Sequence, residues 1–307
     1  MSVRDELNRA VELANLGKRS EARDAVLSLE PRIKEPRLRI QLIDVSLSAL
    51  DNVKDNAKKA TLSIEGTRIA EGMGRVDLQA HFMAKTADLV MTQVALWHYR
   101  RSMLKLAPRW FQFATETEQK EHESLTTVID KLESEMNTLL SRAMSLSERS
   151  GDKKIRASVL MSLGSIESAR YLRYKMDCMR GIRAKLWTTF AFARNPIFEY
   201  LLTISNGDAQ KLNVHVKSFI RSYLKAARLS EEIGDPLAGY AYYNLAVHLK
   251  SAYRFAAAKR CLGNARSVAS RHNDSALMQR LEVLKKSIKA KNKDIPDYLS
   301  GETREIN

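Results

Sequence analysis

The segment Leu229-Ser230-Glu231-Glu232-Ile233-Gly234-Asp235 indicates the architecture, because a close copy of it, Leu146-Ser147-Glu148-Arg149-Ser150-Gly151-Asp152, occurs earlier in the same chain. Fainter copies lie around Gly74 and at Asn273-Asp274. The intervals from Gly74 to Gly151 and from Gly151 to Gly234 are each close to twice a period of about 40 residues, which is typical of helical-repeat proteins. In such proteins each unit buries its apolar face against the next. We therefore predict an all-α fold, an α-solenoid of stacked antiparallel helical hairpins.

The amino-acid composition agrees with an all-α chain. Among 307 residues there are only 12 Gly and 6 Pro, and 44% of the residues are hydrophobic. A fold with many short strands and turns would need more Gly and Pro than this. The hydrophobic fraction is large enough for a continuous core. The two cysteines, Cys178 and Cys261, lie far apart and form no CxxC pair. We expect both to be buried, reduced thiols.

The sequence favours a cytoplasmic protein without a membrane partner. The N-terminal residues are charged and amphipathic, unlike the uninterrupted apolar run of a signal peptide. The most apolar stretch, 186–204, is interrupted by Arg194, Pro196 and Glu199. These interruptions favour a buried helix pair over a membrane-spanning helix.

Two segments have the apolar spacing of a complete helical hairpin. The first flanks Gly17 and ends before Pro31 and Pro36; its stripes are Leu7, Ala10, Val11 and Ala14, then Ala22, Ala25, Val26 and Leu29. The second covers 236–274; its stripes are Tyr242, Leu245, Ala246 and Leu249, then Phe255, Ala258, Leu262 and Ala265. Before the second segment, Gly234 is suited to end a helix, and Asp235 is suited to cap the next one.

The rest of the chain suggests three parts. Residues 1–115 are expected to form near-neutral N-terminal hairpins, and 116–288 to form repeats with a basic surface and a C-terminal capping helix. The apolar stripe of that last helix is Leu277, Leu281, Leu284 and Ile288. One apolar face on an otherwise polar helix is what a solenoid needs in order to stop stacking. Residues 289–307 are expected to be a polar tail.

The second hairpin resembles the tetratricopeptide repeat family. The residues that match that family's pattern in order and spacing are Ala246, Leu249, Phe255, Ala258, Leu262 and Ala265, while Tyr253 replaces the usual Gly at the turn. The first hairpin matches comparably, and Gly164 restates the small first-helix position in a unit that is otherwise degenerate. The resemblance implies a concave groove that binds a peptide, lined here by Tyr240, Tyr243, Val247 and Lys250. Because Tyr243 and Val247 stand where the family's carboxylate-clamp subgroup needs Lys and Asn, recognition of a chaperone C-terminus is not expected.

No pattern in the sequence points to catalysis. The six histidines have neither H-E-x-x-H nor E-x-x-H spacing, and Gly72-Met73-Gly74 lacks the further Gly and the Lys of a phosphate-binding loop. We therefore expect a protein that is not an enzyme, with no metal, no cofactor and no small-molecule substrate.

Positive charge is concentrated in the C-terminal half. The net charge is +15, yet residues 1–150 carry 23 Lys and Arg against 22 Asp and Glu. Two clusters form a candidate basic patch: Arg170, Arg173, Arg180, Arg183 and Lys185 in the first, and Lys285, Lys286 and Lys289 in the second. Such clusters fit a solvated helix face, a phosphate-binding surface or a docking face for an acidic protein.

These features together suggest a non-enzymatic adaptor or regulator that binds a protein or peptide partner in its groove, and the basic half favours an acidic partner. The alternative is RNA or DNA binding by the basic C-terminal half, which would depend steeply on salt. A third interpretation is a structural protein that assembles with copies of itself.

Overall fold

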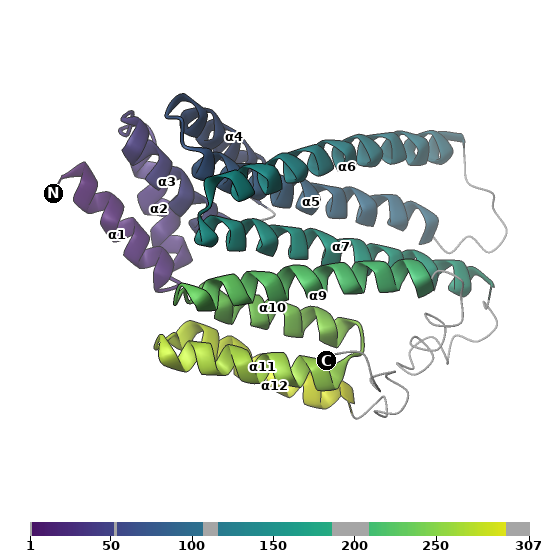
Figure 1. Cartoon of the computed structure of the whole chain (residues 1–307). Coiled ribbons are helices and arrows are strands. Elements are labelled where there is room, and N and C mark those ends of the chain that lie inside the picture. Colours follow the sequence, from purple (N-terminus) through teal and green to yellow (C-terminus); the bar gives the residue numbers. More distant parts are fainter. Residues whose placement is uncertain (1, 52–53, 107–115, 186–208, 293–307) are drawn as a thin grey trace. The chain divides into compact units, whose positions relative to one another are not determined.

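The computed structural model describes residues 2–51, 54–106, 116–185 and 209–292, and within these ranges it contains eleven helices and no strand. Figure 1 shows them in chain order. The helices are α1 (Val3–Asn15), α2 (Arg19–Leu29), α3 (Pro36–Ala49), α4 (Asn56–Gly72), α5 (Val76–Leu106), α6 (Glu116–Ser150), α7 (Lys153–Lys185), α9 (Ala209–Glu232), α10 (Leu237–Ser251), α11 (Phe255–Arg271) and α12 (Ser275–Asn292). The all-α prediction is confirmed. None of the described helices combines the length and the apolar character needed to cross a bilayer.

The chain divides into two compact units, Met1–Ser162 and Leu163–Asn307, and the division falls inside α7. We expected a boundary between residues 115 and 116, and the residues just before it, 107–115, lie outside the described residues. The helices on either side of it, α5 and α6, belong to the first unit. The stretch 186–204 also lies outside the described residues.

In the first unit, each helix packs against its neighbours in sequence, as in a helical solenoid. A first core joins α1, α2 and α3, and the predicted stripe residues Leu7, Ala10, Ala22, Val26 and Leu29 are all buried in it. A second core joins α3, α4 and α5 around Phe82, and a third joins α5, α6 and the start of α7 around Ala143. No one hairpin closes a core of its own, which is the property expected of a repeat array.

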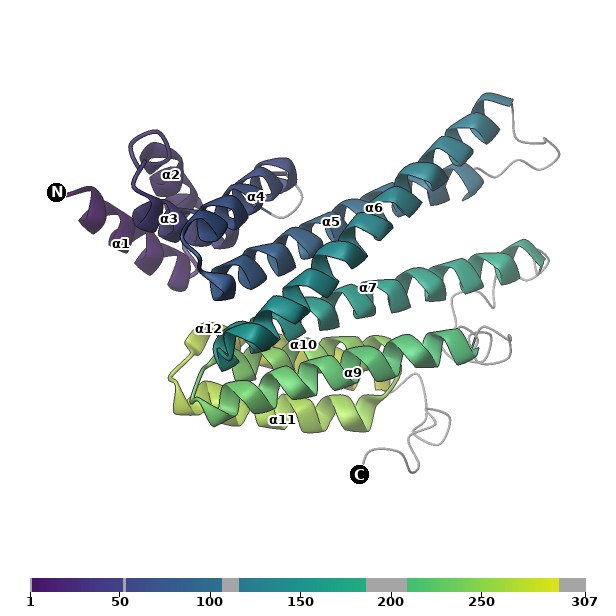
Figure 2. The ribbon, with the colours of Figure 1, turned by 45° about the horizontal axis from the view of Figure 1, so that its top comes forward.

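A period of about 40 residues, as in common helical repeats, does not hold through the first unit. Between Gly74 and Gly151 the described helices are only α5 and α6, which have 31 and 35 residues. Figures 1 and 2 show them side by side along most of their length, and Arg100 reaches across to Glu121 at 2.8 Å. The described residues between Gly74 and Gly151 therefore form one pair of long helices. The period of about 40 residues predicts two shorter hairpins in this interval; this prediction was wrong, because an apolar stripe repeats every turn and does not reveal where a helix ends.

The second unit is built around α10. This helix packs against α9, α11 and α12, and Figures 1 and 2 both show it beside α9 and α11. None of its residues is exposed. Gly239 faces the C-terminal helix α12 so closely that a Cβ added to it would lie 2.7 Å from the side chain of Leu277. The predicted stripe of α12, Leu277, Leu281, Leu284 and Ile288, is buried.

One backbone turn recurs at the helix ends and explains the repeated phrase. A residue one or two positions after the last helical residue has a positive φ at each of these ends: Gly17, Gly74, Gly151, Gly234, Tyr253 and Asn273. At Gly234 its N–H donates to Glu231 O at 3.1 Å, and the next N–H donates to Ser230 O at 2.8 Å. This pair of hydrogen bonds is the Schellman pattern, and it satisfies carbonyls that a helix end leaves without partners.

The aspartate that follows the turn caps the next helix, as predicted. Asp235 accepts from the N–H of Leu237 at 2.8 Å, and Asp152 accepts from that of Lys154 at 2.8 Å. In the faint copy, Asp274 accepts from the N–H of Leu277 at 2.8 Å. The repeated Gly-Asp pair thus ends one helix and begins the next.

Candidate functional site

The first basic cluster on α7 is engaged inside the second unit. Glu167 is buried, with 7% of its surface exposed. It accepts from Arg170 at 2.6 Å and lies 2.7 Å from Nδ1 of His215 on α9. Burial raises the pKa of Glu167, but the hydrogen bond of His215 and the charge of Arg170 outweigh burial, and the net pKa is lowered. Arg170 therefore helps to hold α7 against α9.

Arg173 also contacts other side chains of the second unit. Its guanidinium lies 5.3 Å from the ring centre of Tyr174, and that ring stacks on His215 with centroids 5.1 Å apart. Arg173 is half-buried. Arg180, Arg183 and Lys185 belong to α7, but their side chains lie outside the described residues.

Lys175, which was not part of the predicted basic patch, is more enclosed than Arg170 and Arg173. It is 7% exposed, and its Nζ donates to Ser251 O at 3.1 Å. The same Nζ lies 4.2 Å from the ring centre of Tyr253. Lys175 therefore covers the turn between α10 and α11, where Tyr253 has a φ of 60°.

The predicted groove residues all lie on α10 and are half-buried. Lys250 donates to Ser287 of α12 at 3.0 Å. Burial, followed by a hydrogen bond to Asp274 at the start of α12, raises the pKa of Tyr240 to about 12. Tyr240 and Lys250 thus connect α10 to the C-terminal helix α12. Tyr243 and Val247 lie between them on the same face of α10. Their role in binding a partner stays a prediction.

The second basic cluster lies on the open side of α12. Lys285, Lys286 and Lys289 are exposed, and the acid nearest to them in sequence, Glu282, is already paired with Arg266 of α11. These three lysines carry charge that the described part of α12 does not neutralise.

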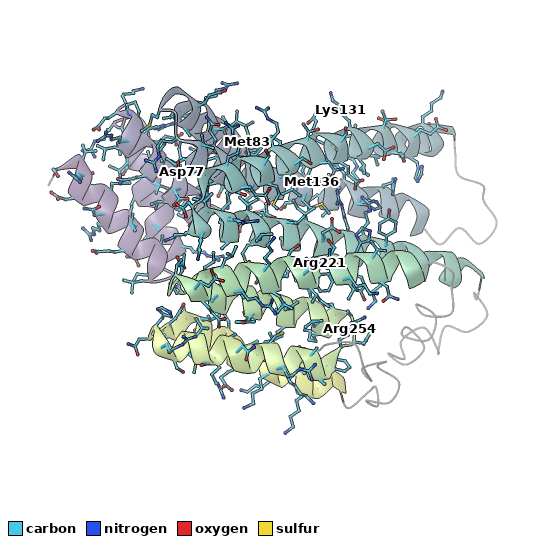
Figure 3. All side chains as sticks on the ribbon, in the orientation of Figure 1. Asp77, Met83, Lys131, Met136, Arg221 and Arg254 are labelled. Atoms are coloured by element: carbon cyan, nitrogen blue, oxygen red, sulfur yellow. The ribbon has the colours of Figure 1, made fainter. Side chains whose placement is uncertain are left out.

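A further row of cations runs along α9, and sequence reasoning missed it. We call it the α9 ladder; its members are Lys217, Arg221, Lys225 and Arg228, and all four are exposed. Arg221 is labelled on this helix in Figure 3. Spacings of four, four and three residues place the four on one helix face. That spacing was readable in the sequence, but the cluster of Arg and Lys between Arg170 and Lys185 drew attention to α7 instead.

The carboxylates of the second unit do not balance these cations. Each carboxylate whose side chain the structure describes there already has a contact. Glu167 is paired as above, Asp235 and Asp274 cap helices, and Glu282 pairs with Arg266. Glu231 contacts Tyr242 and Arg271, and Glu232 also has an interaction. By contrast, no ion pair reaches the α9 ladder from any described residue.

The described residues offer no arrangement for metal or thiol chemistry. They contain no group of three or more His, Cys, Asp or Glu side chains that could hold a metal ion. Cys261 is a buried, free thiol, and burial raises its pKa to about 11. A thiol with so high a pKa is a poor nucleophile at neutral pH.

No protein-family model matches the chain, and no curated protein matches it either.

Proposed function

We propose that the chain is a non-enzymatic helical-repeat protein, tetratricopeptide-like in its second unit, which binds an acidic protein segment on that unit. The observation that carries this proposal is the unequal use of charge. The described carboxylates of the second unit are engaged in caps and ion pairs, whereas the cations of the α9 ladder and of α12 are exposed.

Uncompensated surface charge of one sign speeds encounters with partners of the opposite sign. The stability of the unit does not require these cations, because the buried face of α9 is made of other residues, among them Phe219, Tyr223 and Ala226. The tetratricopeptide-like part of the proposal is supported by the hairpin α10–α11, in which Ala246, Leu249, Phe255, Ala258, Leu262 and Ala265 are all buried.

The experiment is a titration of the full chain against defined labelled probes, followed by fluorescence anisotropy at near-physiological salt. The probes are a Glu-rich helical peptide of about 20 residues, long enough to span about 30 Å, its Gln-for-Glu counterpart, a single-stranded RNA and a duplex DNA. We expect the Glu-rich peptide to bind at least about tenfold more tightly than the Gln peptide, a difference of about 1.4 kcal/mol.

Two results would overturn the proposal. One is equal binding of the Glu-rich and Gln peptides, which would remove the role of charge. The other is tighter binding of RNA or DNA than of the acidic peptide, with a steep loss of affinity as salt rises, since such a loss marks neutralisation of phosphates.

A further inference from the structure

The α9 ladder differs in its partners from the described basic residues that α7 contributes to the same unit. Arg170 and Lys175 on α7 are held by buried or backbone partners. Lys217, Arg221, Lys225 and Arg228 are exposed and receive no ion pair from the described residues. Like charges four residues apart on a helix repel one another, so the row weakens α9 when no partner is present.

The row is continuous and slants gradually around the helix, because each step of four residues advances about 40° around the axis. With a rise of about 1.5 Å per residue, each step of four residues is about 6 Å, and the row from Lys217 to Arg228 is about 16 Å long. Between these two ends α9 contains no acid; Glu231 and Glu232 come only after Arg228.

The edges of the ladder are apolar. Ile220 and Leu224 are half-buried on α9 beside the row. Val214, one turn before Lys217, has 63% of its surface exposed. A partner that pairs with the cations can therefore also bury apolar side chains. The resulting interface combines ion pairs with apolar contacts, as protein interfaces commonly do.

From this geometry we propose that the α9 ladder binds an acidic α-helix of a partner protein, one whose carboxylates recur at i, i+4, i+8 and i+11. The inference rests on the proposed function and assigns its site. A helix with that spacing carries its acids along one face at the same steps of about 6 Å. Each carboxylate therefore meets one cation when the two helices cross at about −50°, the angle at which two rows of this spacing run parallel.

The ladder fits a helix better than a single-stranded nucleic acid. Binding to single strands relies on aromatic side chains on which bases stack, and the stretch of α9 from Lys217 to Arg228 holds aromatics only at the buried Phe219 and Tyr223. This stretch therefore offers no exposed ring on which a base could stack.

The test compares two peptides of identical composition and two variants of identical net charge. In the first peptide Glu recurs at i, i+4, i+8 and i+11 on one face; in the second the same residues are distributed around the helix. The ladder variant is Arg221→Glu with Lys225→Glu, and the matched control is Lys285→Glu with Lys286→Glu on α12. A milder variant, Arg221→Gln with Lys225→Gln, is included in case the reversal disturbs folding, which circular dichroism checks.

We expect the one-face peptide to bind the unmodified chain about fivefold more tightly than the distributed one, since an exposed ion pair contributes up to about that factor. We expect the ladder variant to lose about tenfold or more in affinity for the one-face peptide, while the α12 control stays within about twofold.

The outcomes separate the site from the function. Equal losses in the ladder variant and the α12 control would overturn the ladder as the site and leave the proposed function standing, with binding spread over the whole basic surface. Absence of binding to both peptides would overturn both. If the ladder variant lost RNA or duplex DNA binding more strongly than peptide binding, the partner would be a nucleic acid and the helix proposal would be wrong.

Discussion

The ring of Tyr223 on α9 lies against the backbone of Gly164 on α7, so that a Cβ added to Gly164 would stand 2.9 Å from the ring. Tyr223 is 1% exposed and also stacks on His248 of α10. Its ring therefore has little room to move, and only glycine allows α7 and α9 to approach this closely.

We predict that Gly164→Ala lowers the free energy of unfolding by about 1–3 kcal/mol, because it overpacks a closed contact. The measurement is guanidinium denaturation followed by circular dichroism. The matched control is Gly263→Ala on α11, where an added Cβ meets nothing within 4 Å; there we expect a gain of about 0.5–1 kcal/mol from helix propensity alone. Equal effects at the two sites would contradict the contact.

The two non-glycine turn residues should respond in opposite directions to glycine. Asn273 has an exposed side chain and a φ of 53°, so Asn273→Gly relieves backbone strain at little cost and should stabilise by up to about 1 kcal/mol. Tyr253 has a φ of 60° but is 2% exposed. Tyr253→Gly should destabilise by about 2–4 kcal/mol, since loss of a buried aromatic side chain outweighs the relief. Denaturation of both variants checks the signs; a gain at Tyr253 would mean that its packing contributes little.

Acid should destabilise the second unit through His248. Burial lowers the pKa of His248 from 6.5 to about 4. Between these two pH values the unfolded chain takes up a proton that the folded chain does not, so the free energy of unfolding falls as the pH falls from about 6.5 towards 4. At a pH near 5.5 this loss is about 1 kcal/mol relative to neutral pH.

Replacing His248 by Phe should remove that part of the pH dependence. The aromatic stack on Tyr223 is kept, and the Ser168 hydroxyl that contacts His248 at 3.1 Å still has its bond to Ser165 O at 2.7 Å. Denaturation curves of both proteins near neutral pH and near pH 5.5 check this. An unchanged loss in His248→Phe would assign the acid sensitivity to other groups, such as Glu167, whose lowered pKa contributes stability that is lost only as the pH falls below about 4.5.

Charge reversal within the ladder should not harm the fold. Arg221→Glu places a carboxylate four residues from both Lys217 and Lys225, which replaces two repulsive pairs by two attractive ones. We expect a gain of about 0.5–1 kcal/mol at low salt that shrinks as salt is added. Thermal unfolding in low and high salt measures it; a loss of stability at both would show that Arg221 packs against the unit.

The helix ends were more predictable than the helix lengths. Gly234 and Asp235 act locally, one through its backbone conformation and one through its side chain, so their roles follow from the residues themselves. The apolar stripes of α1, α2, α10, α11 and α12 were also readable. The 31 and 35 residues of α5 and α6 were not, because a stripe at helical spacing continues unchanged whether one helix or two carry it.

The candidate site was less predictable than the fold. A cluster of Arg and Lys in the sequence does not show which side chains the fold employs: Arg170 is paired with a buried carboxylate, whereas Arg221 is exposed. The carboxylate that holds Arg170 is itself shared with His215 on another helix, 48 residues away in sequence. Only the packed structure distinguishes a cation that stabilises the unit from one that remains available to a partner.

The turn shared by Gly17, Gly74, Gly234, Tyr253 and Asn273 satisfies its backbone groups within one helical end, whatever the length of the helix before it. Helices of very different length can therefore end in the same turn. α9 has 24 residues and α1 has 13, and the difference amounts to about three complete turns, or about 16 Å. An insertion of whole turns leaves the apolar face and the outgoing direction of the chain unchanged. In such a protein the length of a hairpin can change by more than about 10 Å without any change in how it is connected.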